Sequence, residues 1–207
     1  MKLKWIFFTV PIGIFLTVAV FVGPIMSDVE TPEYKILKTE GNIQLRRYDP
    51  MIIALVNVKG TRRDAIGKGF RLLADFIFGD NVAQRTIGDP AETRESIKIA
   101  MTAPVQQQLV DSGWQISFVM PSKYTTGTLP SPTNKLITIR TEDSRDFFTI
   151  TFSGMNSDQN LEENQNILMK YLEINNILTN TKPVYAFYNP PWTLPFLRRN
   201  EILIAKD

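Results

Sequence analysis

Residues 188–202, YNPPWTLPFLRRNEI, decide the fold that we expect for this chain of 207 residues. Pro190 and Pro191 fix the backbone φ angle and remove two amide donors, and Pro195 follows shortly after them. This composition predicts a rigid apolar turn rather than a helix or a central strand. The apolar run 202–205 continues from the turn, which predicts a terminal strand tied into a sheet. The turn can close the core, form one wall of a ligand cleft, or do both.

An earlier stretch, residues 97–105, reads IKIAMTAPV and combines alternating apolar residues with a proline turn. After a polar gap, residues 114–121 (WQISFVMP) are a second strand-like run. We expect a strand in each stretch, because alternation with a period of two is typical of half-buried strands. The two proline turns, 101–104 and 188–191, are expected at comparable places in the two halves of the chain.

The other strands are expected where short apolar runs lie between turn residues such as Gly41-Asn42 and Asp49-Pro50. These runs are residues 34–37, 43–48, 51–59, 136–140, 147–152 and 184–188. The polar segments 79–96 and 122–134 are rich in turn-forming residues, so we expect them to be loops.

Two helices are expected, over residues 62–78 with Thr61 as N-cap, and over residues 158–176 with Ser157 or Asp158 as N-cap. The order of strands, helix, strand, proline turn and strand therefore occurs twice, and matching features lie roughly 90 residues apart. This pattern indicates an internally duplicated α+β unit.

Composition excludes several kinds of chemistry. The chain contains no cysteine and no histidine, which excludes disulfides, thiolate metal sites and both Ser-His-Asp and Cys-His catalysis. Lys2 and Lys4 are the only charges before Asp28, so they account for the formal net charge of +2 and the rest of the chain is neutral. This balance does not favour binding to nucleic acid.

The N-terminus carries an apolar leader. Residues 5–26 contain no charge and are long enough to span a bilayer as a helix. We expect a signal anchor over residues 1–26, a linker over 27–33 and a single domain over 34–207; a cleaved signal peptide is the alternative. Because the lysines precede the apolar run, the domain is expected outside the cytoplasm, which in a bacterium is the periplasm.

The stretches IKIAMTAPV and YNPPWTLPFLRRNEI resemble the two signature segments of the SOUL heme-binding protein family. Residues 43–60, IQLRRYDPMIIALVNVKG, are similar to that family's opening hairpin. The resemblance extends over roughly residues 34–206. It implies an α+β fold in which two similar halves form a curved antiparallel sheet, a distorted barrel, with two helices packed on it.

The resemblance also implies a non-covalently bound heme or other tetrapyrrole in an apolar cleft beside the first helix. Because the chain has no histidine, histidine cannot ligate the iron. The remaining mode of binding is apolar contact with the ring, with basic side chains near the propionates. Lys68 and Arg71 are the candidate cations, although the family's basic helix position falls at Gly67. Four apolar residues at helical spacing are the candidate wall: Ile66, Phe70, Leu73 and Ile77.

Several features leave alternatives open. Gly67 and Gly69 allow close approach to the helix, either by a strand or by a flat ligand. Met101, Tyr48 and Tyr188 can pack in the core or ligate iron. The acidic pairs 142–143 and 162–163 have the character of solvated charges, so we do not expect an enzyme.

Two functions are therefore compared. The first is reversible tetrapyrrole binding for transport or buffering. The second is binding of another amphiphilic small molecule, or of a protein partner, by the same fold.

Overall fold

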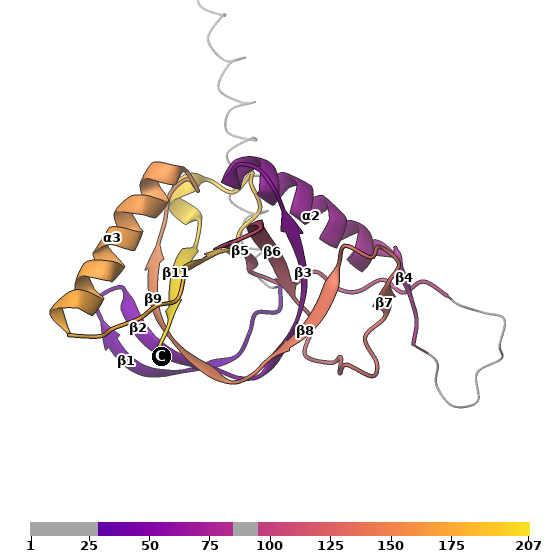
Figure 1. Ribbon diagram of the computed structural model, residues 1–207, viewed down its shortest axis with the longest axis horizontal. Coiled ribbons are helices and arrows are strands. Elements are labelled where there is room, and N and C mark those ends of the chain that lie inside the picture. The colour runs from indigo at the N-terminus through magenta and orange to yellow at the C-terminus, as the bar shows by residue number, and fades with distance from the viewer. Residues whose placement is uncertain (1–28, 85–94) are drawn as a thin grey trace, which may run out of the picture.

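The computed structural model describes residues 29–84 and 95–207. The expected leader, residues 1–26, and the middle of the polar segment 79–96 lie outside the described residues. In chain order the elements (Figure 1) are β1 (Tyr34–Glu40), β2 (Ile43–Tyr48), β3 (Met51–Val58), α2 (Arg62–Phe78), β4 (Asn81–Val82), β5 (Val105–Val110), β6 (Gly113–Val119), β7 (Ser131–Pro132), β8 (Thr138–Glu142), β9 (Arg145–Phe152), α3 (Asp158–Ile174), β10 (Val184–Phe187), the 3₁₀ turn η1 (Pro195–Leu197) and β11 (Asn200–Ala205).

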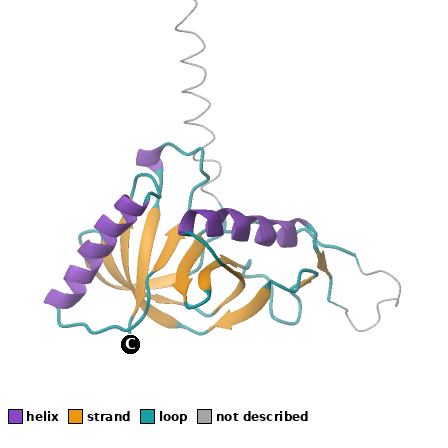
Figure 2. Cartoon of the chain, turned by 45° about the horizontal axis from the view of Figure 1, so that its top comes forward, coloured by secondary structure: helices purple, strands orange, loops and turns teal. Residues whose placement is uncertain are grey.

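Nine strands form one curved antiparallel sheet in the order β1-β2-β9-β11-β10-β5-β6-β3-β8. Figure 2 shows this sheet as a single curved layer, with α2 and α3 lying along it. The edge strands β1 and β8 pair with one neighbour each, β2 and β3. The α+β class is confirmed, and the distorted barrel implied by the resemblance is an open half-barrel.

The strands on the two sides of the central β5–β10 pair follow one another in equivalent order. On one side of the β5–β10 pair follow β6, β3 and β8, and on the other side follow β11, β9 and β2. Each half thus contains a strand, a second strand, a helix and a two-stranded hairpin. The first strand of each half, β2 or β8, pairs with the second strand of the other half, β9 or β3.

The two proline turns are not at comparable places in these halves. The turn before Val105 leads into β5, whereas the turn after Phe187 follows β10. Because β5 and β10 are antiparallel and Val105 pairs with Phe187, both turns lie at the same end of this strand pair.

The strand expected over residues 97–105 is wrong for residues 97–104, since this segment joins no ladder and β5 begins only at Val105. Its polar groups bond elsewhere: the amide of Ile99 donates to the carbonyl of Ile77 at 2.8 Å, and the hydroxyl of Thr102 donates to the carbonyl of Val119 at 2.5 Å. The apolar alternation reflects packing beside the end of α2 rather than pairing in the sheet.

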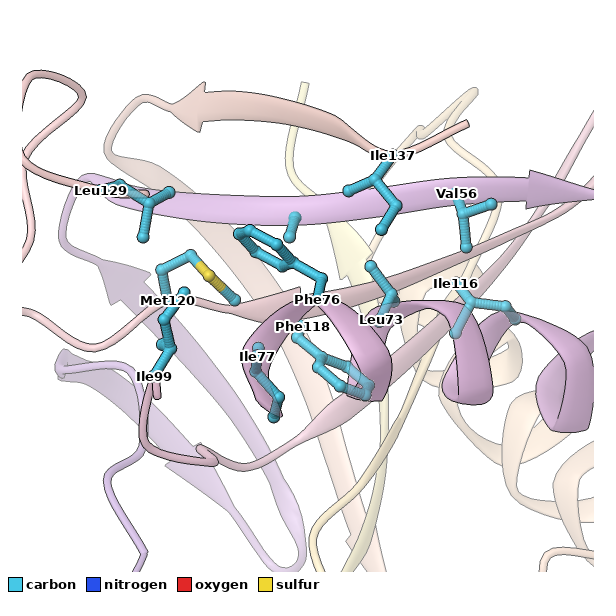
Figure 3. Close-up of a cluster of buried hydrophobic side chains, with 11 residues drawn as sticks. Val56, Leu73, Phe76, Ile77, Ile99, Ile116, Phe118, Met120, Leu129 and Ile137 are labelled. Atoms are coloured by element: carbon cyan, nitrogen blue, oxygen red, sulfur yellow. The ribbon is translucent and has the colours of Figure 1, made fainter. Parts of the chain in front are cut away.

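Helix α2 has the expected bounds, and the side chain of Thr61 accepts from the amide of Asp64, as expected of an N-cap. Its apolar stripe packs on β6 and β3 in the main core cluster, shown in part in Figure 3. At Gly69 the helix lies close against β6, because a Cβ atom there would lie 2.4 Å from Cγ1 of Ile116. The strand alternative is therefore confirmed for Gly69.

Helix α3 is capped by Ser157 and ends at Ile174, two residues before the expected end. It buries Leu161, Leu168 and Leu172 against the outer face of β9 and β11. Within the described residues, neither helix is long and apolar enough to cross a bilayer.

The two glycines of α2 give a matched test of this packing. Gly69→Ala is expected to lower the free energy of unfolding by about 1–3 kcal/mol, since Ile116 has to move. Gly67→Ala is expected to raise it by up to ~1 kcal/mol, because a Cβ atom there meets nothing within 4 Å and alanine favours the helix. Urea unfolding of both variants measures the difference, and shifts of the same sign would contradict the close approach at Gly69.

Candidate functional site

Of the four residues of the candidate wall on α2, two are buried in the core and two lie at its margin. Leu73 and Ile77 are fully buried and point into the cluster that also contains Phe76 and Phe118 (Figure 3). They form the centre of the core between α2 and the sheet. A ligand can reach them only if part of that core opens.

Ile66 and Phe70 lie at the margin of this core. Ile66 is half-buried, and Phe70 is 41% exposed with its ring 5.4 Å from that of Phe118. Gly67, next to Ile66, is exposed. We call residues 66, 67 and 70 the α2 strip. It is open and apolar, and at its outer edge Gly67 has no side chain, which suits the face of a flat ring.

The two candidate cations are both exposed but lie at different angles around α2. With 3.6 residues per turn, Arg71 is about 100° from Phe70, and Lys68 is about 160° from it. Arg71 therefore flanks the α2 strip, whereas Lys68 is on the other side of the helix.

Met101 lies in the segment that runs from α2 to β5. It is half-buried and packs against the core cluster below α2. Neighbouring Thr102 and Ala103 are buried. The sequence-based alternative of packing is thus observed for Met101, and its role as an iron ligand stays a prediction.

The proline turn, residues 188–199, is closed by its own hydrogen bonds. Nε of Arg198 donates to the carbonyl of Thr193 at 2.7 Å, and the amide of Arg199 donates to Oδ1 of Asn189 at 2.6 Å. The amide of Gly154 donates to the carbonyl of Pro195 at 2.8 Å. The turn is thereby fixed to the loop between β9 and α3.

A buried carboxylate at the start of β11 was not found by the sequence reasoning. Ile202 and Ile204 pack under α3 on the outer face, so Glu201 points to the inner face, where it is fully buried. Nη1 of Arg46 lies 3.0 Å from both carboxylate oxygens, and Nη2 of Arg199 lies 2.8 Å from Oε1. The hydroxyl of Tyr188 donates to Oε2 at 2.8 Å. One charged residue inside the apolar strand NEILIA was the available signal.

The two tyrosines that were candidate iron ligands, Tyr48 and Tyr188, are hydrogen-bonded within this cluster. Burial, with the charge of Glu201, raises the pKa of Tyr48 to about 12 and that of Tyr188 well above its usual value. Burial alone would lower the pKa of Arg46, but the carboxylate of Glu201 raises it. Both phenols are therefore neutral hydrogen-bonding groups, and binding iron would remove either from this cluster.

Two cavities lie away from α2. The larger, about 450 Å³, is formed by the segment before β1, the β2–β3 turn and the loop after β6; its lining is Glu30, Thr31, Pro32, Glu33, Asp49, Pro50, Met51, Ile52, Thr102, Val119, Met120, Pro121, Ser122, Tyr124, Thr126 and Thr141. The smaller, about 200 Å³, lies on the inner face and is lined by polar side chains of β5, β6 and β8 together with apolar residues of β9 and β11.

The side chains near α2 decide whether a tetrapyrrole could be held through its iron or by its ring face. In the part of the chain that the structure describes, no three acidic, histidine or cysteine side chains gather to hold a metal ion. The α2 strip offers apolar contact and one flanking arginine, and the thioether of Met101 packs against the core. These residues fit a tetrapyrrole held by its ring face and do not fit one held through its iron.

Glu201→Gln tests the buried cluster, because it leaves the charge of Arg46 buried without a counter-ion. We expect the free energy of unfolding to fall by roughly 3 kcal/mol. Glu142→Gln is the matched control, since Glu142 pairs with Arg140 at the surface and its loss should cost at most about 1 kcal/mol. Urea midpoints measure both, and equal losses would contradict a structural role for Glu201.

Comparison with solved structures shows that the fold is shared. The C-terminal domain of EcmrR is similar with a TM-score of 0.57 and 11% identity, over 84% of this chain and 98% of that one. A hydrolase from Listeria innocua is similar with a TM-score of 0.53 and 9% identity, over 83% of this chain and 94% of that one. At these identities the likeness concerns the fold alone. A search of curated protein sequences found no significant match.

A family comparison covers nearly the whole described chain. The model of the SOUL heme-binding protein family matches residues 29–205, from just before β1 to the end of β11. This match includes the opening hairpin, the segment before β5 and the proline turn, on which the resemblance was based. The chain therefore belongs to the SOUL heme-binding protein family.

Proposed function

We propose that this protein binds heme or another tetrapyrrole reversibly and without histidine ligation, for transport or buffering rather than for turnover. Membership of the SOUL heme-binding protein family is the observation that carries this proposal. The absence of histidine from the chain sets the mode of binding.

The α2 strip is the proposed contact surface for the ring. Ile66 and Phe70 supply apolar contacts at the edge of the core, and Gly67 lets a flat ligand approach the helix backbone. Arg71 is the proposed partner of a propionate, because a guanidinium binds a carboxylate in a planar, charge-assisted geometry. Lys68 contributes less in this arrangement, because it lies on the other side of α2.

The proposal includes attachment to a membrane through residues 5–26, or export after cleavage of this leader. The supporting observation is the sequence: the apolar run is free of charge and follows two lysines. A tethered binder outside the cytoplasm would meet amphiphilic ligands as they leave or enter the bilayer.

The larger cavity favours a second candidate, a different amphiphilic ligand bound by the same fold. Its apolar lining includes Ile52 and Met120, and its three charged lining residues, Glu30, Glu33 and Asp49, are acidic. Such a lining repels the propionates of a tetrapyrrole and suits a neutral or cationic amphiphile.

Titration of the full chain with hemin and with protoporphyrin IX tests the main proposal. We expect saturable one-to-one binding of both ligands, with affinities that depend little on iron. Absorbance and quenching of tryptophan fluorescence measure the binding. Phe70→Asp should weaken the binding of both roughly tenfold, which corresponds to ~1.4 kcal/mol. Ile174→Asp, at an exposed position of α3, is the control and should bind as the unaltered chain does. Unchanged affinity of a folded Phe70→Asp variant would remove α2 from the site.

The propionate contact is tested by comparing hemin with a porphyrin ester that lacks free propionates. Arg71→Ala should weaken hemin binding several-fold, by about 1 kcal/mol, and leave ester binding nearly unchanged. Lys68→Ala is the matched control on the opposite side of the helix, and its effect on hemin should be smaller. Equal losses for hemin and ester in Arg71→Ala would refute the contact.

A further inference from the structure

The proline turn exposes a compact set of apolar side chains. Trp192 is 63% exposed and Phe196 is 70% exposed, and Leu197 is exposed beside them. Met155 is also exposed and follows Gly154, whose amide donates to the carbonyl of Pro195. Residues 188–197 contain no charged side chain. Three large apolar side chains exposed on one short turn are a candidate interaction surface.

Hydrogen bonds within the turn hold its backbone in place. The amide of Thr193 donates to the carbonyl of Pro190 at 3.0 Å, and the amide of Leu197 donates to that of Leu194 at 2.9 Å. Arg198 donates from its side chain to the carbonyl of Thr193, and prolines have no amide to satisfy. These bonds give the turn a fixed shape, so its apolar side chains are held at the surface of the domain.

The position of the turn relates it to the leader. The carbonyl of Glu30 accepts from the amide of Ala103 at 2.9 Å, and Val105, two residues later, pairs with Phe187 at the base of the turn. The start of the described chain and the turn therefore lie at the same end of the β5–β10 pair.

The length of chain before Val29 limits how far the domain can stand from the leader. The apolar run ends at Met26, three residues before Val29, and three residues span at most about 10 Å. If residues 5–26 lie in a bilayer, the end of the domain that carries Val29 faces its surface closely, and the turn belongs to that end.

We propose that residues 188–197 form a membrane-contact element that places Trp192, Phe196 and Leu197 in the interfacial layer of a phospholipid bilayer. The inference rests on the proposed membrane tether, and it adds a second contact that fixes the orientation of the domain. Tryptophan favours this layer because its ring is amphipathic.

Quenching by brominated phosphatidylcholine in vesicles that hold the full chain tests the proposal. The chain has three tryptophans, Trp5, Trp114 and Trp192, so Trp5→Phe with Trp114→Phe leaves the turn as the reporter. We expect a blue-shifted emission that the brominated lipid quenches roughly twofold or more, as for an indole at the interface.

Two further variants provide the controls. Leu178→Trp, in a background with Trp5, Trp114 and Trp192 all changed to Phe, reports from an 88% exposed site beyond the far end of α3. That helix of 17 residues is about 25 Å long, so the lipid should leave this reporter unquenched. A variant that keeps only Trp5 reports whether the leader is inserted.

The outcomes separate the contact from the tether. Quenching of Trp5 without quenching of Trp192 overturns the contact and leaves the tether standing. Quenching of Trp192 without quenching of Trp5 supports the contact and overturns the tether, and no quenching of either overturns both. Equal quenching of the Trp192 and Leu178→Trp reporters contradicts a specific contact. Protection of Trp192 from iodide that grows with protein concentration in the absence of lipid assigns the turn to a protein interface and overturns the proposal.

Discussion

Pairing between β5 and β10 is the interaction on which the rest of the structure depends. It joins two halves of equal element order into one sheet, and its antiparallel register, with Val105 opposite Phe187, brings both proline turns to one end. The helices reinforce the same junction: Nε of Arg62 at the start of α2 lies 2.6 Å from the carboxylate of Asp158 at the start of α3. Exchange of β2 and β8 between the halves then prevents either half from forming its full sheet alone.

The inner face of the second half combines an apolar cluster with a buried charge cluster. Glu201 is fully buried, and two arginines and a tyrosine satisfy its oxygens. Taking an ion pair out of water is unfavourable unless each charge has several partners. The cluster meets this condition, since Arg46 also bonds to Tyr48 and stacks over the ring of Tyr34. It therefore fixes how β1, β2 and β11 lie together, as a set of apolar side chains would not.

The core and the proposed binding surface share one helix. The inner side of α2 is in contact with β6 at Gly69, which leaves no room for a ligand between helix and sheet. Ligand contact is consequently assigned to the margin, where Phe70 is both a core neighbour of Phe118 and a surface residue.

Local patterns in the sequence were sufficient for both helices, their N-caps, most strands and the terminal strand, because capping and periodicity act over a few residues. The family followed from the two proline segments and the opening hairpin. Tertiary structure alone decided the rest. Alternation at residues 97–104 indicates burial but does not say whether a strand or a helix is the neighbour, and four apolar positions on α2 do not reveal which two are covered. The partners of Glu201 come from β2 and from the proline turn. Contacts between such distant segments exist only once the chain has folded, so no local pattern records them.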